Sequence, residues 1–190
     1  YPGIIRPIFE EENQYSKPGM TIGRMLLNME VPESVKYIAI CEGDDYWTDP
    51  LKLQKQVDFL EGNAEYTICH HPVRNFHQDS NTFEEPSIDT EIPQTSTIHD
   101  LAKYDYIANL SVVYRRIQLS DKERELVMSV YPADYTLHLI HAQYGEIYRF
   151  NDIMGVYRIG SGVWSSTSRL HQIEGTLLVL RKLMDYFGTR

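Results

Sequence analysis

Residues 37–56 read YIAICEGDDYWTDPLKLQKQ, and this stretch decides the fold class. Residues 37–41 are continuously apolar and have the length of a strand, which is typical of a strand buried on both faces. Acidic residues follow at once, and Pro50 then fits the first turn of a helix over residues 51–61. A buried strand that leads into an amphipathic helix predicts an α/β protein.

The same alternation continues on both sides of this stretch. Further strands are predicted at residues 4–9, 66–70, 110–114, 147–150 and 154–157. Further helices are predicted at residues 20–30, at 121–130 with Ser120 as N-cap, from Asp134 to about residue 144, and at 166–187. Residues 75–97 are polar and contain two prolines, so we expect a long surface loop there. No internal repeat is present, and the length fits one domain.

Two of these helices carry apolar residues at helical spacing. In the helix at 51–61 we expect the apolar face to be formed by Leu53, Val57 and Leu60, with Lys52, Lys55 and Gln56 on other faces. In the helix at 166–187 the apolar residues recur every three or four positions, at Leu170, Ile173, Leu177, Leu180, Met184 and Phe187. Both patterns predict helices that pack on a core.

Charge and composition exclude several classes of protein. The 190 residues carry 18 Lys and Arg against 27 Asp and Glu, a net charge of −9, so general nucleic-acid binding is not expected. No apolar run approaches the roughly 18 residues that a membrane span requires. Cys41 and Cys69 each lie in an apolar run, and two buried free thiols, which suit a reducing cytoplasm, are expected rather than a disulfide.

The strongest chemical signal is the acidic end of the first long apolar strand. Glu42, Asp44 and Asp45 place three carboxylates within four residues, and their mutual repulsion has to be offset by a cation or by protonation. Mg²⁺ and Mn²⁺ prefer such oxygen ligands, and ligands of open α/β sheets bind at strand ends. Gly43 is expected to allow a sharp turn. The alternative is a helix-entry loop whose acids are simply solvated, and residue types alone leave the two about equal.

Residues 37–56 as a whole resemble the Asp-X-Asp segment of family 2 glycosyltransferases, which have the GT-A fold and include many bacterial enzymes of surface-polysaccharide assembly. The similarity continues more loosely through residues 66–71, 111–115, 131–137 and 157–165. It implies a single glycosyltransferase-like domain over residues 1–190, with a GT-A-like (Rossmann-like) mixed, mostly parallel sheet flanked by helices. Residues 1–36 do not resemble the first βα units of the family, so we expect an N-terminally incomplete core.

The resemblance assigns roles to individual residues. Glu42 takes the first acidic place and Asp44 the second, so Asp44 is the expected metal ligand, and Asp45 follows; all three would bind the donor diphosphate. Asp134 resembles the catalytic base, and the alternative for this residue is a helix N-cap. Arg158 lies in a segment similar to one that closes over the diphosphate, with a hairpin edge as the alternative. Relatives often carry a histidine after this arginine, whereas residues 159–160 here are Ile and Gly.

Trp47 and Ser111 are expected in the sugar or acceptor pocket, with a core position as the alternative for Trp47. Other candidates are weaker. Adjacent residues on a strand point to opposite faces, so His70 and His71 are not expected to share one metal ion. His138 and His141 lie three residues apart on a predicted helix, but the sequence shows no third metal ligand near them.

The resemblance implies a metal-dependent inverting transfer of a sugar from a nucleotide sugar, favoured to be of UDP type, to a saccharide or a lipid-linked saccharide. The divalent metal would be Mn²⁺ or Mg²⁺. A cytoplasmic location follows, with peripheral attachment to the inner membrane left open, and an uncovered sheet edge favours a homo-oligomer. The alternatives are a non-catalytic carbohydrate- or nucleotide-binding module on the same scaffold, and a metal-dependent phosphohydrolase.

Overall fold

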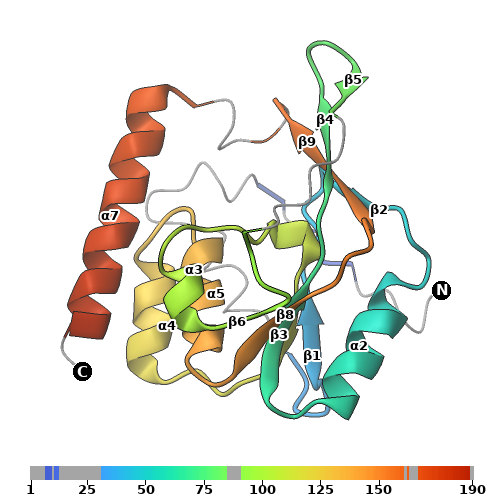
Figure 1. The fold of residues 1–190 in the computed structure, drawn as a ribbon. Coiled ribbons are helices and arrows are strands. Elements are labelled where there is room, and N and C mark those ends of the chain that lie inside the picture. Colours follow the sequence, from blue (N-terminus) through green and yellow to red (C-terminus); the bar gives the residue numbers. More distant parts are fainter. Residues whose placement is uncertain are drawn as a thin grey trace.

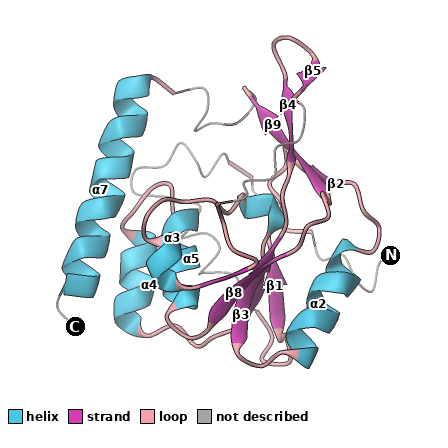
Figure 2. Ribbon diagram, viewed as in Figure 1, coloured by secondary structure: helices cyan, strands magenta, loops and turns pink. Residues whose placement is uncertain are grey.

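The computed structural model describes residues 7–9, 11–12, 31–84, 91–160, 162 and 167–188. In this part of the chain it contains two mixed β-sheets and five α-helices, without a closed barrel (Figures 1 and 2). The protein is therefore of mixed α/β class. The strand predicted at residues 4–9 lies largely outside the described residues, and the helix predicted at 20–30 lies wholly outside them.

The larger sheet forms the centre of the molecule and has the order β1-β7-β3-β8-β6. Its strands are β1 (Tyr37–Ala39), β3 (Tyr66–His70), β6 (Thr95–Ser96), β7 (Val113–Arg115) and β8 (Glu146–Arg149). Only the β3–β8 pair is parallel, and the other three pairs of this sheet are antiparallel. The expectation of a mostly parallel sheet is therefore wrong for the described strands. A continuous apolar run indicates that a strand is buried on both faces, but it does not give the direction of the neighbouring strands. Antiparallel strands between two helical layers are also buried on both faces.

The second sheet has the order β2-β9-β4-β5 and continues strands of the first. It consists of β2 (Tyr46–Trp47), β4 (Arg74–His77), β5 (Thr82–Phe83) and β9 (Gly155–Ile159). The chain passes from the first sheet into the second three times, from β1 to β2, from β3 to β4 and from β8 to β9 (Figure 1). The acidic residues 42–45 occupy the first of these crossings, so the two sheets meet at the candidate site.

Helices cover both faces of the larger sheet. Helix α2 (Lys52–Gly62) lies on one face, and α3 (Ile98–Leu101), α4 (Asp121–Met128) and α5 (Asp134–Ala142) lie on the other (Figure 2). Ser120 caps α4 as predicted, because its Oγ accepts a hydrogen bond from the Glu123 N–H. The last helix, α7 (Arg169–Gly188), packs outside α4.

Side chains of the central strands alternate between two cores, one beneath each helical layer. Ile68 and Tyr114 are buried on the side of α4 and α5, whereas their neighbours Cys69 and Val113 are buried on the side of α2 with Leu60. This period of two is what a strand buried on both faces requires. Of the two thiols, Cys69 is buried and Cys41 is exposed, and both are free, so the prediction of two buried thiols is wrong for Cys41.

The region predicted as a long loop at 75–97 is only partly a loop. It contributes most of β4, all of β5 and all of β6 to the two sheets, and residues 85–90 lie outside the described residues. Strand β4 was missed because its residues Arg74, Asn75, Phe76 and His77 show little apolar alternation. It is held by parallel pairing with β9, a strand about 80 residues away in the chain.

The C-terminal helix forms as predicted, but the face that it buries is not the predicted one. Val179 and Leu183 are buried against the body of the protein, and Phe187 packs partly on the same core. The other five residues of the predicted stripe are 41–72% exposed, namely Leu170, Ile173, Leu177, Leu180 and Met184. Among the described helices, this one included, no segment is long and apolar enough to cross a membrane.

Candidate functional site

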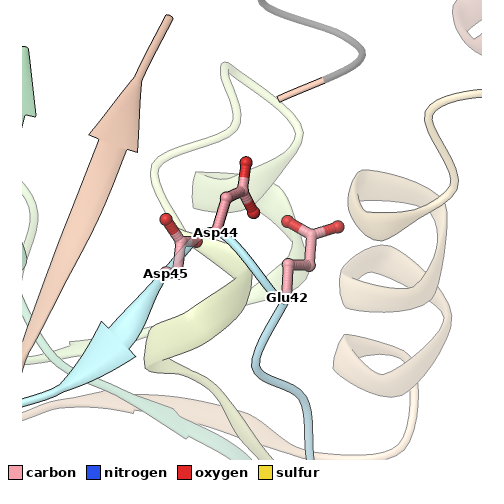
Figure 3. A group of neighbouring side chains, drawn as sticks. All are labelled: Glu42, Asp44 and Asp45. Atoms are coloured by element: carbon pink, nitrogen blue, oxygen red, sulfur yellow. The ribbon is translucent and has the colours of Figure 1, made fainter. Parts of the chain in front are cut away.

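The acidic loop forms a tight turn between the two sheets. The Asp45 N–H donates to the Glu42 carbonyl oxygen at 3.2 Å, which closes the turn. Carboxylate oxygens of Glu42, Asp44 and Asp45 all lie within 4.8 Å of one another, and Figure 3 shows the three side chains grouped on this loop. Gly43 has no left-handed backbone angle, so the expected sharp turn does not depend on a glycine conformation.

Asp45 connects the acidic loop to the second sheet. Its Oδ1 accepts a hydrogen bond from the backbone N–H of Arg158 at 2.8 Å, which ties the loop to β9. The side chain is only 9% exposed, and its Oδ2 has no hydrogen-bond partner among the described residues. A buried carboxylate oxygen without a donor is costly, and a bound cation is one way to satisfy it.

The loop opens into a cavity of about 700 Å³ between the two sheets and the helical layer. Glu42 lines this cavity from the end of β1, and Asp134 lines it from the first turn of α5. The chain therefore brings together two of the acids that the sequence singled out, although they are 92 positions apart. Asp134 is not the N-cap of α5, because Ala133 occupies that position and Asp134 Oδ1 accepts from the Tyr135 N–H at 2.9 Å.

The carboxylates in and around this cavity are poorly solvated. Burial, followed by repulsion from Asp134, raises the pKa of Glu42 to about 7. Burial raises the pKa of Asp45 to about 6, against the hydrogen bond from Arg158. Burial also raises the pKa of Asp134, while His138 acts in the opposite direction. A cluster of acids that hold protons near neutral pH is suited either to bind a cation or to transfer a proton.

A ring of tyrosines, which the sequence analysis did not single out, forms much of the cavity wall. Its members are Tyr104, Tyr106, Tyr131, Tyr135 and Tyr157. Tyr157 lies close to the acids. Burial raises its pKa, and the charges of Asp45 and Glu42 raise it further. The rings of Tyr104 and Tyr106 pack edge to face, with their centroids 5.6 Å apart. Tyrosines spread over several segments give no local pattern, so only the fold reveals this wall.

A buried polar network packs against Trp47, which follows the acidic loop in the chain. Lys52 is 1% exposed; its Nζ donates to Gln56 Oε1 at 2.8 Å and lies 4.4 Å from the ring centre of Trp47. Gln56 in turn donates to the carbonyl oxygens of Cys69 and Ser111, so that it joins α2 to β3 and to the turn before β7. Burial lowers the pKa of Lys52 to about 8. The prediction that Lys52 and Gln56 lie away from the core is therefore wrong.

Five residues assigned to the site are not part of the described cavity wall, namely Asp44, Asp45, Trp47, Ser111 and Arg158. Trp47 donates from Nε1 to the Leu110 carbonyl oxygen at 2.8 Å and packs on Lys52. Ser111 is fully buried, and its hydroxyl donates to the Ala108 carbonyl oxygen at 2.6 Å. The Arg158 guanidinium donates from Nη1 to Gln78 Oε1 at 3.1 Å, on the exposed side of β9.

Comparison with known proteins identifies relatives but no described activity. The chain is 38% identical over 174 residues to uncharacterized proteins of Mycobacterium bovis and of two strains of Mycobacterium tuberculosis. The alignment covers 87% of this chain and 45% of each relative, so the chain spans less than half the length of the proteins that it matches. No family model matches the chain.

Proposed function

We propose that this chain belongs to a metal-dependent inverting glycosyltransferase that moves a sugar from a nucleotide sugar to a hydroxyl acceptor. One observation carries the proposal: Glu42 of the acidic loop and Asp134 line the same cavity. A transferase of this kind needs a group that stabilises the leaving diphosphate and a base for the acceptor hydroxyl, both within reach of one sugar. The resemblance of residues 37–56 to the Asp-X-Asp segment supports the same assignment.

The residues of the acidic loop fit a divalent cation. Three carboxylates within 4.8 Å supply the oxygen ligands that Mg²⁺ and Mn²⁺ prefer, and the unsatisfied Asp45 Oδ2 gains a partner. When bound there, the cation would stabilise the negative charge that develops on the diphosphate. Asp44 is the proposed metal ligand because it takes the second acidic place of the Asp-X-Asp resemblance, and its carboxylate lies within 4.8 Å of those of Glu42 and Asp45.

In this proposal Asp134 accepts the proton of the acceptor hydroxyl. Burial raises its pKa, which makes its carboxylate a stronger base than one in water. The tyrosine wall provides faces on which sugar rings can pack and hydroxyls that can bind them. A GT-A-like arrangement is proposed for the same reasons, with the acidic loop at a strand end and helices on both faces of the sheet.

The tyrosine wall also suits a carbohydrate-binding module without catalysis, and transfer assays separate the two. We expect the whole protein to release UDP from a UDP-sugar only with Mn²⁺ or Mg²⁺ and a saccharide acceptor. Asp134→Asn should lower kcat by about 10² or more with little change in donor KM. Asp44→Asn should abolish transfer, whereas Asp152→Asn, at a side chain 60% exposed beside Lys55, is the matched control.

Each alternative predicts a different result. Saccharide binding that is indifferent to both metal and nucleotide would favour the binding module. Rapid hydrolysis of the sugar nucleotide without an acceptor would favour the phosphohydrolase. Full transfer activity in Asp134→Asn would remove Asp134 from the reaction and overturn the assignment of the base.

A further inference from the structure

His138 lies behind the cavity, on the same helix as Asp134. It follows Asp134 by four residues in α5, so the two side chains share one face of the helix. Its own side chain is fully buried, and neither ring nitrogen makes a hydrogen bond to any described residue. The cost of such an arrangement calls for an explanation beyond packing.

The other buried histidines of the chain differ in this respect. His141, also on α5, has Nδ1 2.8 Å from the Leu137 carbonyl oxygen, and His71 has Nδ1 2.8 Å from that of Pro72. These contacts are typical of a histidine that serves the core. The Nε2 atoms of His70 and His71 are also buried without a described partner, but among the described histidines only His138 has both ring nitrogens in that state. Burial, and then the charge of His138, lower the pKa of His70 to about 3.

The charged neighbour of His138 belongs to the cavity. His138 Nδ1 lies 3.4 Å from Asp105 Oδ1, an ion-pair contact that falls short of an aligned hydrogen bond. Asp105 is 33% exposed and lines the same cavity as Asp134. Polar contacts in ligand-free sites are often long and tighten when the substrate binds. The imidazole is therefore flanked by two carboxylates that both line the cavity.

The remaining surroundings of His138 provide no competing partner. Tyr114 packs its ring 5.9 Å from that of His138, and its buried hydroxyl also lacks a hydrogen bond to any described residue. The titratable groups that face the imidazole are Asp105 from the loop before β7, Asp134 and His141 from α5, His70 from β3 and Tyr114 from β7. Asp105 therefore contacts the buried ring directly, and the charge of the ring acts on Asp134.

We propose that His138, oriented by Asp105, is a positioning residue that stabilises the carboxylate form of Asp134 and so keeps the base ready for the acceptor hydroxyl. This inference rests on the proposed function, since it assigns His138 a role toward the base of that reaction. The contact with Asp105 holds the ring in place, as acids do beside functional histidines. Removal of His138 then leaves Asp134 in a poorly solvated site without the favourable charge of the histidine.

The test combines an activity measurement with one that needs no activity. In His138→Gln we expect kcat to fall about tenfold or more at unchanged donor KM. The titration midpoint of the Asp134 carboxyl, followed by ¹³C NMR, should move to higher pH, because His138 holds the pKa of Asp134 down. His141→Gln is the matched control, as a buried histidine of the same helix, and should leave that midpoint unchanged.

A second variant guards against misfolding of the first. Asp105 is partly exposed, so Asp105→Asn should fold, and it should lower kcat at unchanged donor KM because the ring of His138 loses its charged partner. An unchanged Asp134 midpoint in His138→Gln, or an unchanged kcat in Asp105→Asn, overturns the proposal. If the wild-type protein transfers no sugar, the proposed function fails, and the NMR measurement on His138→Gln still decides whether this histidine controls Asp134.

Discussion

Cation binding by the acidic loop should release protons, in a number that depends steeply on pH. A metal binds carboxylates only in their ionised form, so any proton on Glu42 or Asp45 has to leave. With a pKa of about 7, Glu42 carries about 0.9 proton at pH 6, and Asp45, with a pKa of about 6, carries about 0.5. Binding of Mn²⁺ should therefore release up to about 1.4 protons at pH 6 and about 0.1 at pH 8.

Titration calorimetry with MnCl₂ in two buffers of different protonation enthalpy measures this number directly. Glu42→Gln should reduce the release at pH 6 to about half a proton or less, because Asp45 alone then contributes. Asp152→Asn, outside the cavity, should behave as the wild type. Binding without proton release at either pH, or with more release at pH 8 than at pH 6, would refute the reasoning about these two acids.

The same acids predict how stability depends on pH without a metal. The folded-state pKa values of Glu42 and Asp45 are raised, so these two acids stabilise the folded protein at low pH and lose this effect as the pH rises toward 7. In thermal melts, Mn²⁺ should reduce this loss of stability. Gln56→Leu should lower the free energy of unfolding in urea by about 3 kcal/mol, since it removes the hydrogen bonds of Gln56 to two buried carbonyl oxygens and to Lys52. Gln54→Leu, on the exposed side of α2, should change it by no more than about 0.5 kcal/mol, and equal effects would contradict the network. Gly155→Ala should lower the free energy of unfolding by about 1–2 kcal/mol, because a Cβ there would lie 2.8 Å from the fully buried Leu110 Cδ1. Gly43→Ala places its Cβ in open space and should leave stability unchanged. A Gly155→Ala variant of unchanged stability would show that the site can relax.

Local sequence patterns correctly predicted those features whose residues are close together in the chain. The apolar run at residues 37–41 became β1, and the helices at α2, α4 and α5 begin within one residue of their predicted starts. The Ser120 cap of α4 was also readable, because a cap is made between residues three positions apart. The acids of the loop between β1 and β2 could be identified for the same reason, since they are neighbours in the chain.

Contacts between distant segments could not be predicted from local sequence patterns. Lys52 looks like a solvent-facing residue, and only the approach of Trp47 and Gln56 in the fold makes its burial tolerable. The antiparallel pairing of β1 with β7, and the parallel pairing of β4 with β9, depend on which strands meet, and an apolar run does not encode its partner.

Strand and helix periodicities and adjacent charges are local properties of the chain, and they were enough to identify an α/β protein with carboxylates at a strand end. The folded chain was needed to show that Asp134 lines a cavity together with Glu42 at that strand end, that five tyrosines line it and that Asp105 meets His138 behind it. These groups come from segments up to 115 positions apart, and their proximity follows from how the two sheets and the helical layer pack, which no single segment specifies.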